Sequence, residues 1–341
     1  MPTIHFNILY NKYKSTYFYG LFDFFNHSVI LIVTFYSIYY FKYIYIKYFM
    51  TLLLSLMLTR TFIIFHDCIH DSYTPNKTIN YIISTITGIL TFTSSNWGLD
   101  HKTHHLTNGN INNKYNYKFN ETLHYTVDQY ANFSKLEKII YFIKYNPLIY
   151  FIWSPLLYFF LIHRFIYIYK KIIYGDKIKK YLIMITLDHI INNIGVYFLC
   201  YYLNKYGILN FYLISVYISG VIEFLFFFNQ HTFNPAYVVD DSEWSMMNSG
   251  LIGSSFILLP WYLKYFFNGI EYHHIHHINS KIPGYNQQLF HEEVVENSSF
   301  FDKVTKLTIS DCWSNLSLML YSEKQKKYVT FSEGLDEIKS K

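Results

Sequence analysis

Nine of the sixteen histidines in this chain lie in three short boxes, and their spacing suggests metal chemistry. The boxes read His66-Asp67-Cys68-Ile69-His70, His101-Lys102-Thr103-His104-His105 and His273-His274-Ile275-His276-His277. A tenth histidine, His231, directly follows an apolar stretch. Residues i, i+3 and i+4 share one face of a helix, so each box is predicted to direct its imidazoles towards one point.

The number of clustered imidazoles favours two metal ions over one. A zinc site takes three or four protein ligands, fewer than the boxes supply. Imidazole also suits iron and other transition metals. A proton path along polar histidines is the alternative for such clusters. The isolated histidines are predicted to have no functional role; they are His5, His27, His124, His163, His189 and His291.

Apolar stretches predict the elements that position the boxes. A helix needs about 20 apolar residues to cross a bilayer, and shorter stretches suffice where flanking side chains snorkel. Four stretches qualify, namely Ser28–Ile46, Phe49–Phe65, Tyr181–Leu203 and Gly207–Phe228. The last two flank a short polar link that contains Gly207, which is typical of a tight helical hairpin.

Two further apolar stretches are not expected to be single membrane spans. Ile79–Phe92 is too short and is rich in Thr and Ser. The stretch 139–169 is long enough, but Pro147 and Pro155 interrupt it, and proline ends or kinks a helix. We interpret that stretch as interfacial or re-entrant, crossing zero or two times.

Composition and charge agree with a membrane protein. Of 341 residues, 52% are hydrophobic and 22% aromatic, but only 15% are charged, against about 25% in an average soluble domain. The net charge of +5 comes from lysines clustered between apolar stretches. This pattern fits charges that flank a membrane and does not predict a nucleic-acid partner.

The distribution of basic residues predicts the side on which the boxes lie. Arg164 and the lysines 170, 171, 177, 179 and 180 precede the third apolar span, whereas the far loop has only Lys205. The positive-inside rule therefore places residues 164–180 in the cytoplasm. Because two clear spans separate box two from His231, all three boxes and His231 are expected on that same side.

Motifs around the boxes resemble the membrane fatty acid desaturase family, in particular its bacterial acyl-lipid and omega-6 types. Residues 66–72 resemble that family's HDCxHxS motif, and residues 230–233 resemble its QHxF motif. Trp97 stands before box two as in the family, and Asn146-Pro147, Pro155 and Arg164 recur at similar places. Residues 253–286 resemble its tract GSS…LP…HHIHH…RIPNY, and the likeness covers roughly residues 55–295 in order.

The resemblance implies an all-α, multi-pass integral membrane protein. About four transmembrane helices would form two hairpins, and a cytoplasmic helical cap would hold a non-haem di-iron site. Residues 1–27 would form an N-terminal cytoplasmic segment, residues 28–295 the desaturase domain, and residues 296–341 a polar C-terminal tail. The membrane would be a bacterial plasma membrane or the endoplasmic reticulum.

The resemblance also implies a ligand set and a reaction. Two iron ions would be bound by His66, His70, His101, His104, His105, His231, His273, His276 and His277. With O2 as co-substrate, the centre would remove hydrogens from adjacent methylenes of a membrane acyl lipid or acyl thioester and leave a cis double bond. The chain has no haem-binding HPGG segment. A separate ferredoxin or b-type cytochrome is therefore expected to supply electrons.

Four other residues are expected near the ligands. His274 is the extra histidine of box three, interpreted as a support for the ligands or as a packing residue. Asp67 and Asp100 are adjacent to ligands and could orient them or be solvated surface acids. Glu223 lies within the fourth apolar span, where an ionisable group is a functional candidate. We expect it to contact a ligating imidazole or to face the substrate slot.

The chain departs from the family pattern elsewhere too. Asp71 stands where the family usually has glycine, and Asn268-Gly269-Ile270-Glu271 replaces GNIG before box three. Two alternative functions remain at this point. One is a related di-iron hydroxylase or ketolase. The other is a metal transporter, which would need histidines along the spans and not beside them.

Overall fold

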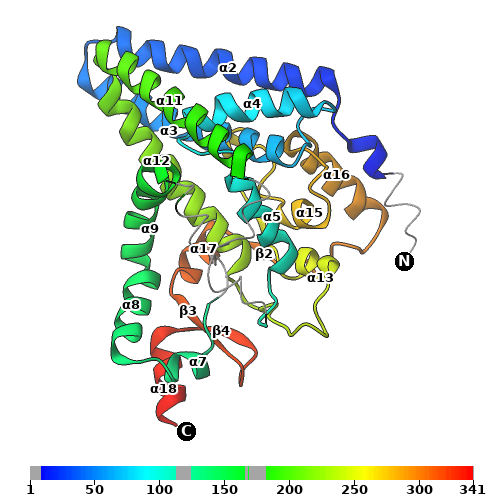
Figure 1. The fold of residues 1–341 in the computed structure, drawn as a ribbon. Coiled ribbons are helices and arrows are strands. Elements are labelled where there is room, and N and C mark those ends of the chain that lie inside the picture. Colours follow the sequence, from blue (N-terminus) through cyan, green and yellow to red (C-terminus); the bar gives the residue numbers. More distant parts are fainter. Residues whose placement is uncertain (1–8, 113–123, 166–167, 169–181, 341) are drawn as a thin grey trace.

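The computed structural model describes residues 9–112, 124–165, 168 and 182–340, and is mainly helical (Figure 1). Four long helices form two hairpins. The first pairs α2 (Tyr17–Tyr40) with α3 (Ile44–Ile69), and the second pairs α11 (Leu182–Lys205) with α12 (Leu209–His231). Both predicted hairpins are confirmed as pairs of helices long and apolar enough to cross a membrane.

The turns of the hairpins follow from local sequence. Lys42 falls within the predicted span Ser28–Ile46. In the structure it lies instead in the three-residue connection between α2 and α3. Gly207 has φ +70° in the connection between α11 and α12, a conformation that L side chains rarely adopt. At its other end, α2 begins after Thr16, whose side chain accepts a hydrogen bond from the Tyr19 amide. The expected division between residues 27 and 28 therefore falls inside α2.

A fifth helical stretch is also long and apolar enough to span a membrane, whereas four were predicted. It follows α8 (Lys135–Tyr145) and comprises α9 (Pro147–Pro155), η1 (Leu156–Leu161) and η2 (Ile162–Phe165). The predicted break at Asn146-Pro147 is confirmed, since Asn146 caps α9 and Pro147 starts it. Pro155 does not end the stretch, because the chain continues through the π-helical turn η1, which absorbs the disruption.

Shorter helices lie beside the long ones and carry two of the boxes. In chain order they are α4 (Lys77–Leu90), α5 (Trp97–Thr107), α7 (Val127–Ala131), α13 (Met246–Leu251), α14 (Trp261–Phe267), α15 (His273–Ile278) and α16 (Gly284–Asn297). α4 has 14 residues and is too short to span a bilayer, as predicted. It packs against α3 and α11.

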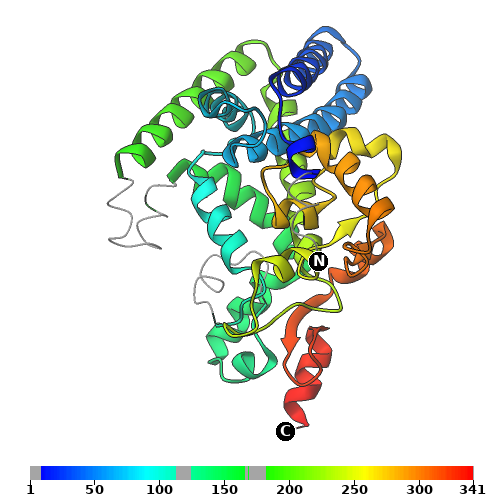
Figure 2. The same cartoon turned by 90° about the vertical axis from the view of Figure 1, so that its right-hand side faces the viewer.

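The all-α prediction needs a correction in the C-terminal part of the chain. β1 (Phe256–Ile257) pairs in parallel with β2 (Lys306–Leu307), and α17 (Ile309–Asn315) follows. β3 (Leu318–Ser322) pairs antiparallel with β4 (Lys327–Thr330) before α18 (Phe331–Lys339). Leu320 and Val329 of this hairpin are fully buried beside α7 and α8, so the expected polar tail contributes to a packed core that it shares with those helices. Figure 2 shows these red elements at the opposite end of the molecule from α2.

The contact between α3 and α12 is the structural centre of the molecule. Leu54, Met57 and Leu58 of α3 are fully buried with Val216 and Tyr212 of α12. Because α3 ends in box one and α12 ends at His231, this packing fixes the relative positions of those histidines. The lysines at 170, 171, 177, 179 and 180, used to predict the cytoplasmic side, lie outside the described residues.

Candidate metal centre

Box one lies at the end of α3, where the helix is closed by its own backbone. His66 is in the last turn, and the His70 amide donates to the His66 carbonyl. Asp71 follows with φ +53°, in the left-handed region that favours glycine. This explains why an otherwise glycine position can be occupied here by aspartate, which tolerates that conformation better than most residues.

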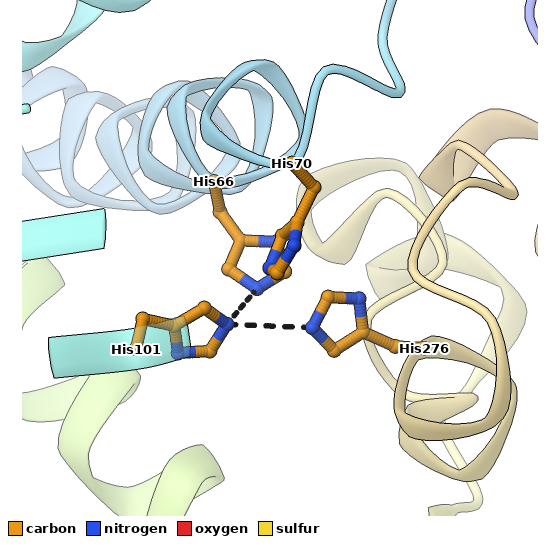
Figure 3. A group of neighbouring side chains, drawn as sticks. All are labelled: His66, His70, His101 and His276. Atoms are coloured by element: carbon orange, nitrogen blue, oxygen red, sulfur yellow. Dashed lines mark hydrogen bonds between the residues drawn. The ribbon is translucent and has the colours of Figure 1, made fainter. Parts of the chain in front are cut away.

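Four imidazoles from three helices converge into a first histidine set, made of His66, His70, His101 and His276 (Figure 3). One ring nitrogen of each lies within 4.8 Å of the others. The Nε2 atoms of His66 and His101 are 2.8 Å apart, and those of His101 and His276 are 3.4 Å apart. This set joins the end of α3 to α5 and α15.

A second histidine set has the same geometry, and consists of His104, His231, His273 and His277. Nε2 of His231 lies 3.0 Å from that of His104 and 2.9 Å from that of His273. The set joins the end of α12 to α5 and α15. Eight of the nine predicted ligands are thus divided equally between two groups of metal-compatible donors.

The prediction that each box directs its imidazoles towards one point is wrong for boxes two and three. His101 belongs to the first set and His104 to the second, while His276 is separated in the same way from His273. Successive helical residues are about 100° apart, so i+3 and i+4 fall on opposite sides of i. The i, i+4 pairs His66–His70 and His273–His277 each stay within one set. In boxes two and three, the histidine at i+3 belongs to the other set from the histidine at i.

His105, the ninth predicted ligand, lies beside the first set and close to the second. Its Nε2 is 3.1 Å from that of His101 and 2.8 Å from that of His276. Its ring also stacks on His277, with ring centroids 4.3 Å apart. His105 is therefore placed where a donor could serve either ion or lie between them.

Burial keeps His101, His105, His273 and His276 neutral, which leaves their lone pairs for a cation. Burial, with a smaller contribution from neighbouring imidazoles, lowers the pKa of His105 to about 3. The same causes hold the pKa of His101, His273 and His276 well below the usual range. Several converging, buried lone pairs fit a bound metal ion, because metals require deprotonated ligands.

A backbone carbonyl fixes the orientation of His231. Nδ1 of His231 donates to the Gly253 carbonyl at 2.9 Å, so its Nε2 carries the lone pair that faces the second set. The neighbouring Ser255 holds this loop against α12, because its amide donates to the Gln230 carbonyl at 3.0 Å. The sequence identified the motif around Gly253 but not the role of its carbonyl group. Every residue has a backbone carbonyl, so residue type does not show which one orients a histidine.

Asp67 lies between a clustered histidine and the segment after box three. Its Oδ1 is 3.4 Å from Nδ1 of His66, and its Oδ2 accepts a hydrogen bond of 2.7 Å from the Gly284 amide. Gly284 is required there, since a Cβ would stand 2.0 Å from the Asn268 carbonyl oxygen. Asp100 is half-buried in the first turn of α5, and its expected supporting role stays a prediction.

His274 points away from both histidine sets. Its Nε2 lies 3.1 Å from Nδ1 of His291, and its ring packs edge-on against Phe301 with centroids 4.6 Å apart. The packing interpretation of His274 therefore fits the geometry. His291 was expected to have no role. Its contact with His274 joins α15 to α16. The two residues are 17 positions apart, too far for helix periodicity to predict their contact.

The other described isolated histidines lie outside both sets, and their expected lack of a functional role stays a prediction. Nε2 of His27 is 2.9 Å from the Thr61 hydroxyl, and Nδ1 of His163 accepts from the Ser94 amide. His189 contacts Asn193 on α11, and His124 lies 3.3 Å from Thr232. His5 falls outside the described residues.

An apolar cavity reaches both histidine sets, and we call it the histidine-side cavity. Its empty volume is about 450 Å³, adjoining open solvent included, and its lining includes His66, His101 and His273. Trp97 also lines it and stacks on His101 with ring centroids 4.3 Å apart. Phe62 and Phe226 line its length. A narrow apolar space that ends at metal-compatible donors can hold an alkyl chain against the reacting centre.

Glu223 of α12 lines this cavity, as expected for a residue that faces the substrate slot. The Ser219 hydroxyl donates to its Oε1 at 2.7 Å. Its Oε2 is buried and has no hydrogen-bond partner among the described residues. No hydrogen bond joins Glu223 to a clustered imidazole in the described part of the chain, and the assignment of the cavity that it lines as the substrate slot stays a prediction.

The departure before box three has a conformational explanation. Asn268 ends α14 with φ +44°, and Gly269 follows with φ +88°. A Cβ on Gly269 would lie 2.1 Å from the Gly284 carbonyl oxygen. Glu271, which replaces a glycine of the family pattern, is buried, and burial raises its pKa to about 7.

Comparison with known proteins agrees with the geometry. The family model described as fatty acid desaturase matches residues 17–304. A curated protein of Bacillus subtilis (strain 168), named fatty acid desaturase, is 30% identical over 299 residues, which cover 84% of this chain and 79% of that protein. The family-model match spans all three boxes and the helices that carry them. The chain is a member of the fatty acid desaturase family.

Proposed function

We propose that this protein is an acyl-lipid desaturase that uses O2 to introduce a cis double bond through a non-haem di-iron centre. Family membership supports a lipid-modifying oxidoreductase. The observation that carries the finer proposal is the histidine-side cavity, which is apolar and is bounded by imidazoles of both sets. A metal centre beside an apolar slot suits a substrate that has only C–H bonds to offer.

In this proposal the nine histidines bind two iron ions. The first set would hold one ion and the second set the other, with His105 near both; the ligands are His66, His70, His101, His104, His105, His231, His273, His276 and His277. When bound, the two ions supply the dioxygen activation needed to break an unactivated C–H bond. Two hydrogens from adjacent methylenes, two external electrons and two protons reduce O2 to two water molecules.

Residues of the chain would bind the acyl chain, orient the histidines and exclude water from the site. Phe62, Phe226 and Phe267 line the slot and exclude water from the acyl chain. The Gly253 carbonyl orients His231, and Trp97 holds the ring of His101. Because an alkyl chain has no polar handle, its position would depend on the shape and depth of the slot.

We place the centre on the cytoplasmic side and infer a separate electron donor. The positive-inside distribution around residues 164–180 supports this side, together with the common location of both histidine sets at neighbouring ends of α3 and α12. The donor would be a ferredoxin or b-type cytochrome. The substrate would be the acyl chain of a membrane lipid or an acyl thioester.

Expression in a host with saturated membrane lipids tests the proposal. Mass spectrometry should find new double bonds at a defined position when the wild-type protein is present and iron and reductant are supplied. The matched control is His104→Ala, which removes one imidazole of the second set. New hydroxyl groups in place of double bonds would instead indicate a hydroxylase of the same di-iron class. No oxidised product from a folded, iron-loaded protein would reject the proposal.

A further inference from the structure

A second cavity continues the histidine-side cavity along the groove between α3 and α12. This deep cavity is a packing gap of about 160 Å³ that is too narrow to hold a water molecule in the wild type, and it is lined by Leu58 of α3 and by Val216, Ser219 and Gly220 of α12, with Phe159 of η1. Glu223 lines both cavities. It therefore stands at the boundary between them.

The spacing along α12 places the two cavities in series. Gln230, Phe227, Phe226 and Glu223 line the histidine-side cavity, and their separations of three and four residues define one helix face. Gly220, Ser219 and Val216 continue that face into the deep cavity. At about 1.5 Å per residue, the deep cavity extends the groove by about 10 Å beyond Glu223.

The carboxyl group at this boundary is held in place from one side. Ser219 donates to Oε1 of Glu223, and the Ser219 and Thr59 hydroxyl groups lie 3.2 Å apart, which links the side chain to α3. Oε2 is buried without a hydrogen-bond partner in the described part of the chain. In an otherwise apolar groove within a membrane-compatible helix, such a group is costly and calls for a function.

We infer that Glu223 is the floor of the acyl slot and determines how many carbons lie between the double bond and the methyl end of the substrate. The inference rests on the proposed function. The methyl end would enter past the histidine sets and stop at the carboxyl group, since an alkyl chain gains nothing by contact with an unsatisfied polar group. The deep cavity would stay empty of substrate because Glu223 closes its entrance.

Removing the floor should lengthen the slot. Glu223→Ala frees the volume of the glutamate side chain and widens the narrow gap beyond it, so the chain slides further and the double bond forms more carbons away from the methyl end. Preference for chains with an extra methyl-end carbon should rise about fourfold for each methylene that the freed space buries. Mass-spectrometric mapping of double bonds in lipids of graded chain length measures both effects.

Three further variants separate the floor from other causes. Glu223→Gln keeps the size and polarity of the side chain and should retain the wild-type position. Ile222→Ala truncates the adjacent residue of α12, which lines neither cavity, and should also retain it. Glu223→Ala combined with Ser219→Leu places an apolar side chain one helical turn away into the freed space and should move the double bond back.

A binding measurement tests the inference without catalysis. A saturated fatty acid with a photoreactive diazirine at its methyl end is crosslinked to metal-free protein, and the labelled residues are identified by mass spectrometry. The label should lie at Glu223 or Phe226 in the wild type and move to the segment 216–220 in Glu223→Ala.

The outcomes are distinct from those for the overall function. An unchanged label in Glu223→Ala, or an unchanged double-bond position in an active Glu223→Ala protein, would overturn the inference. The same would hold if Glu223→Gln shifted the position as far as alanine does. If the wild type makes no double bond, the proposed function fails. Crosslinking then still decides whether Glu223 limits the depth of the bound chain.

Discussion

At one end of the α3–α12 pair, His66 and His231 reach towards the two histidine sets, and at the other end Leu54, Met57 and Val216 pack in a dry core. At the polar end, neutral imidazoles stabilise each other little, whereas a bound cation would interact favourably with all of their lone pairs. The apolar end offers no chemistry but holds the helices at a fixed separation. The comparison indicates that one region should determine metal binding and the other stability, so substitutions at the two ends should have separable effects.

The largest effect is expected at the histidine end. His104→Ala removes a donor whose Nε2 lies 3.0 Å from that of His231 and 3.2 Å from that of His277. Double-bond formation should fall to the background of the host, because the proposed second ion loses a ligand. Lipid analysis by mass spectrometry measures the product, and protein level in the membrane is the control. Substantial desaturation by a His104→Ala protein would break the proposed division of roles.

A truncation at the apolar end should give the opposite pattern. Leu54 is fully buried and lines neither cavity. Leu54→Ala should destabilise the protein by about 2–5 kcal/mol, the usual cost of emptying a buried leucine site. Thermal or denaturant unfolding in detergent measures the loss. Iron bound per folded chain should stay at the wild-type value, and a fall in that ratio would show that the two ends are not separable.

A smaller effect is expected for the carboxylate beside His66. Asp67 lies 3.4 Å from Nδ1 of His66 and also accepts from the Gly284 amide. Asp67→Asn should weaken iron binding about 10–100-fold, as is typical for residues that orient a metal-bound histidine. Titration with a competing chelator measures the affinity. The control is Asp240→Asn, which changes an exposed carboxylate remote from the boxes in sequence. Equal affinities for all three proteins would contradict a supporting role for Asp67.

The smallest effect on metal binding is expected for His274, although it stands inside box three. Its ring contacts His291 and Phe301 and faces neither set. His274→Gln should leave iron per folded chain unchanged and cost about 1 kcal/mol of stability through the lost packing and hydrogen bond. Elemental analysis of the purified protein, with His273→Gln as the comparison, measures the difference. A loss of iron as large as that of His273→Gln would contradict this placement.

Local sequence patterns predicted the parts of the molecule that depend on local interactions. The hairpin around Gly207 and the helix start at Pro147 follow from backbone preferences of single residues. Helix periodicity also predicted that His66 shares a set with His70, and His273 with His277. The span criterion also predicted that α4 is too short to cross a bilayer.

The features that were not predicted depend on contacts between distant segments. Box two is divided between the two sets because α5 lies between the ends of α3 and α12, which no spacing within the box reveals. Leu320 and Val329 form strands because they pack beside Tyr130 and Tyr141, almost 200 residues earlier. The π-helical turn after Pro155 similarly allows a helical stretch to continue where proline alone predicts an end.

The ratio of iron to folded protein tests the central claim most directly. The wild-type protein is purified in detergent, loaded with ferrous iron under reducing conditions and freed of loosely bound metal. We predict about two iron ions per chain, because two separate groups of four imidazoles converge within 4.8 Å each. A ratio of about one, or none, in protein that is folded by circular dichroism would contradict a di-iron centre built from both histidine sets.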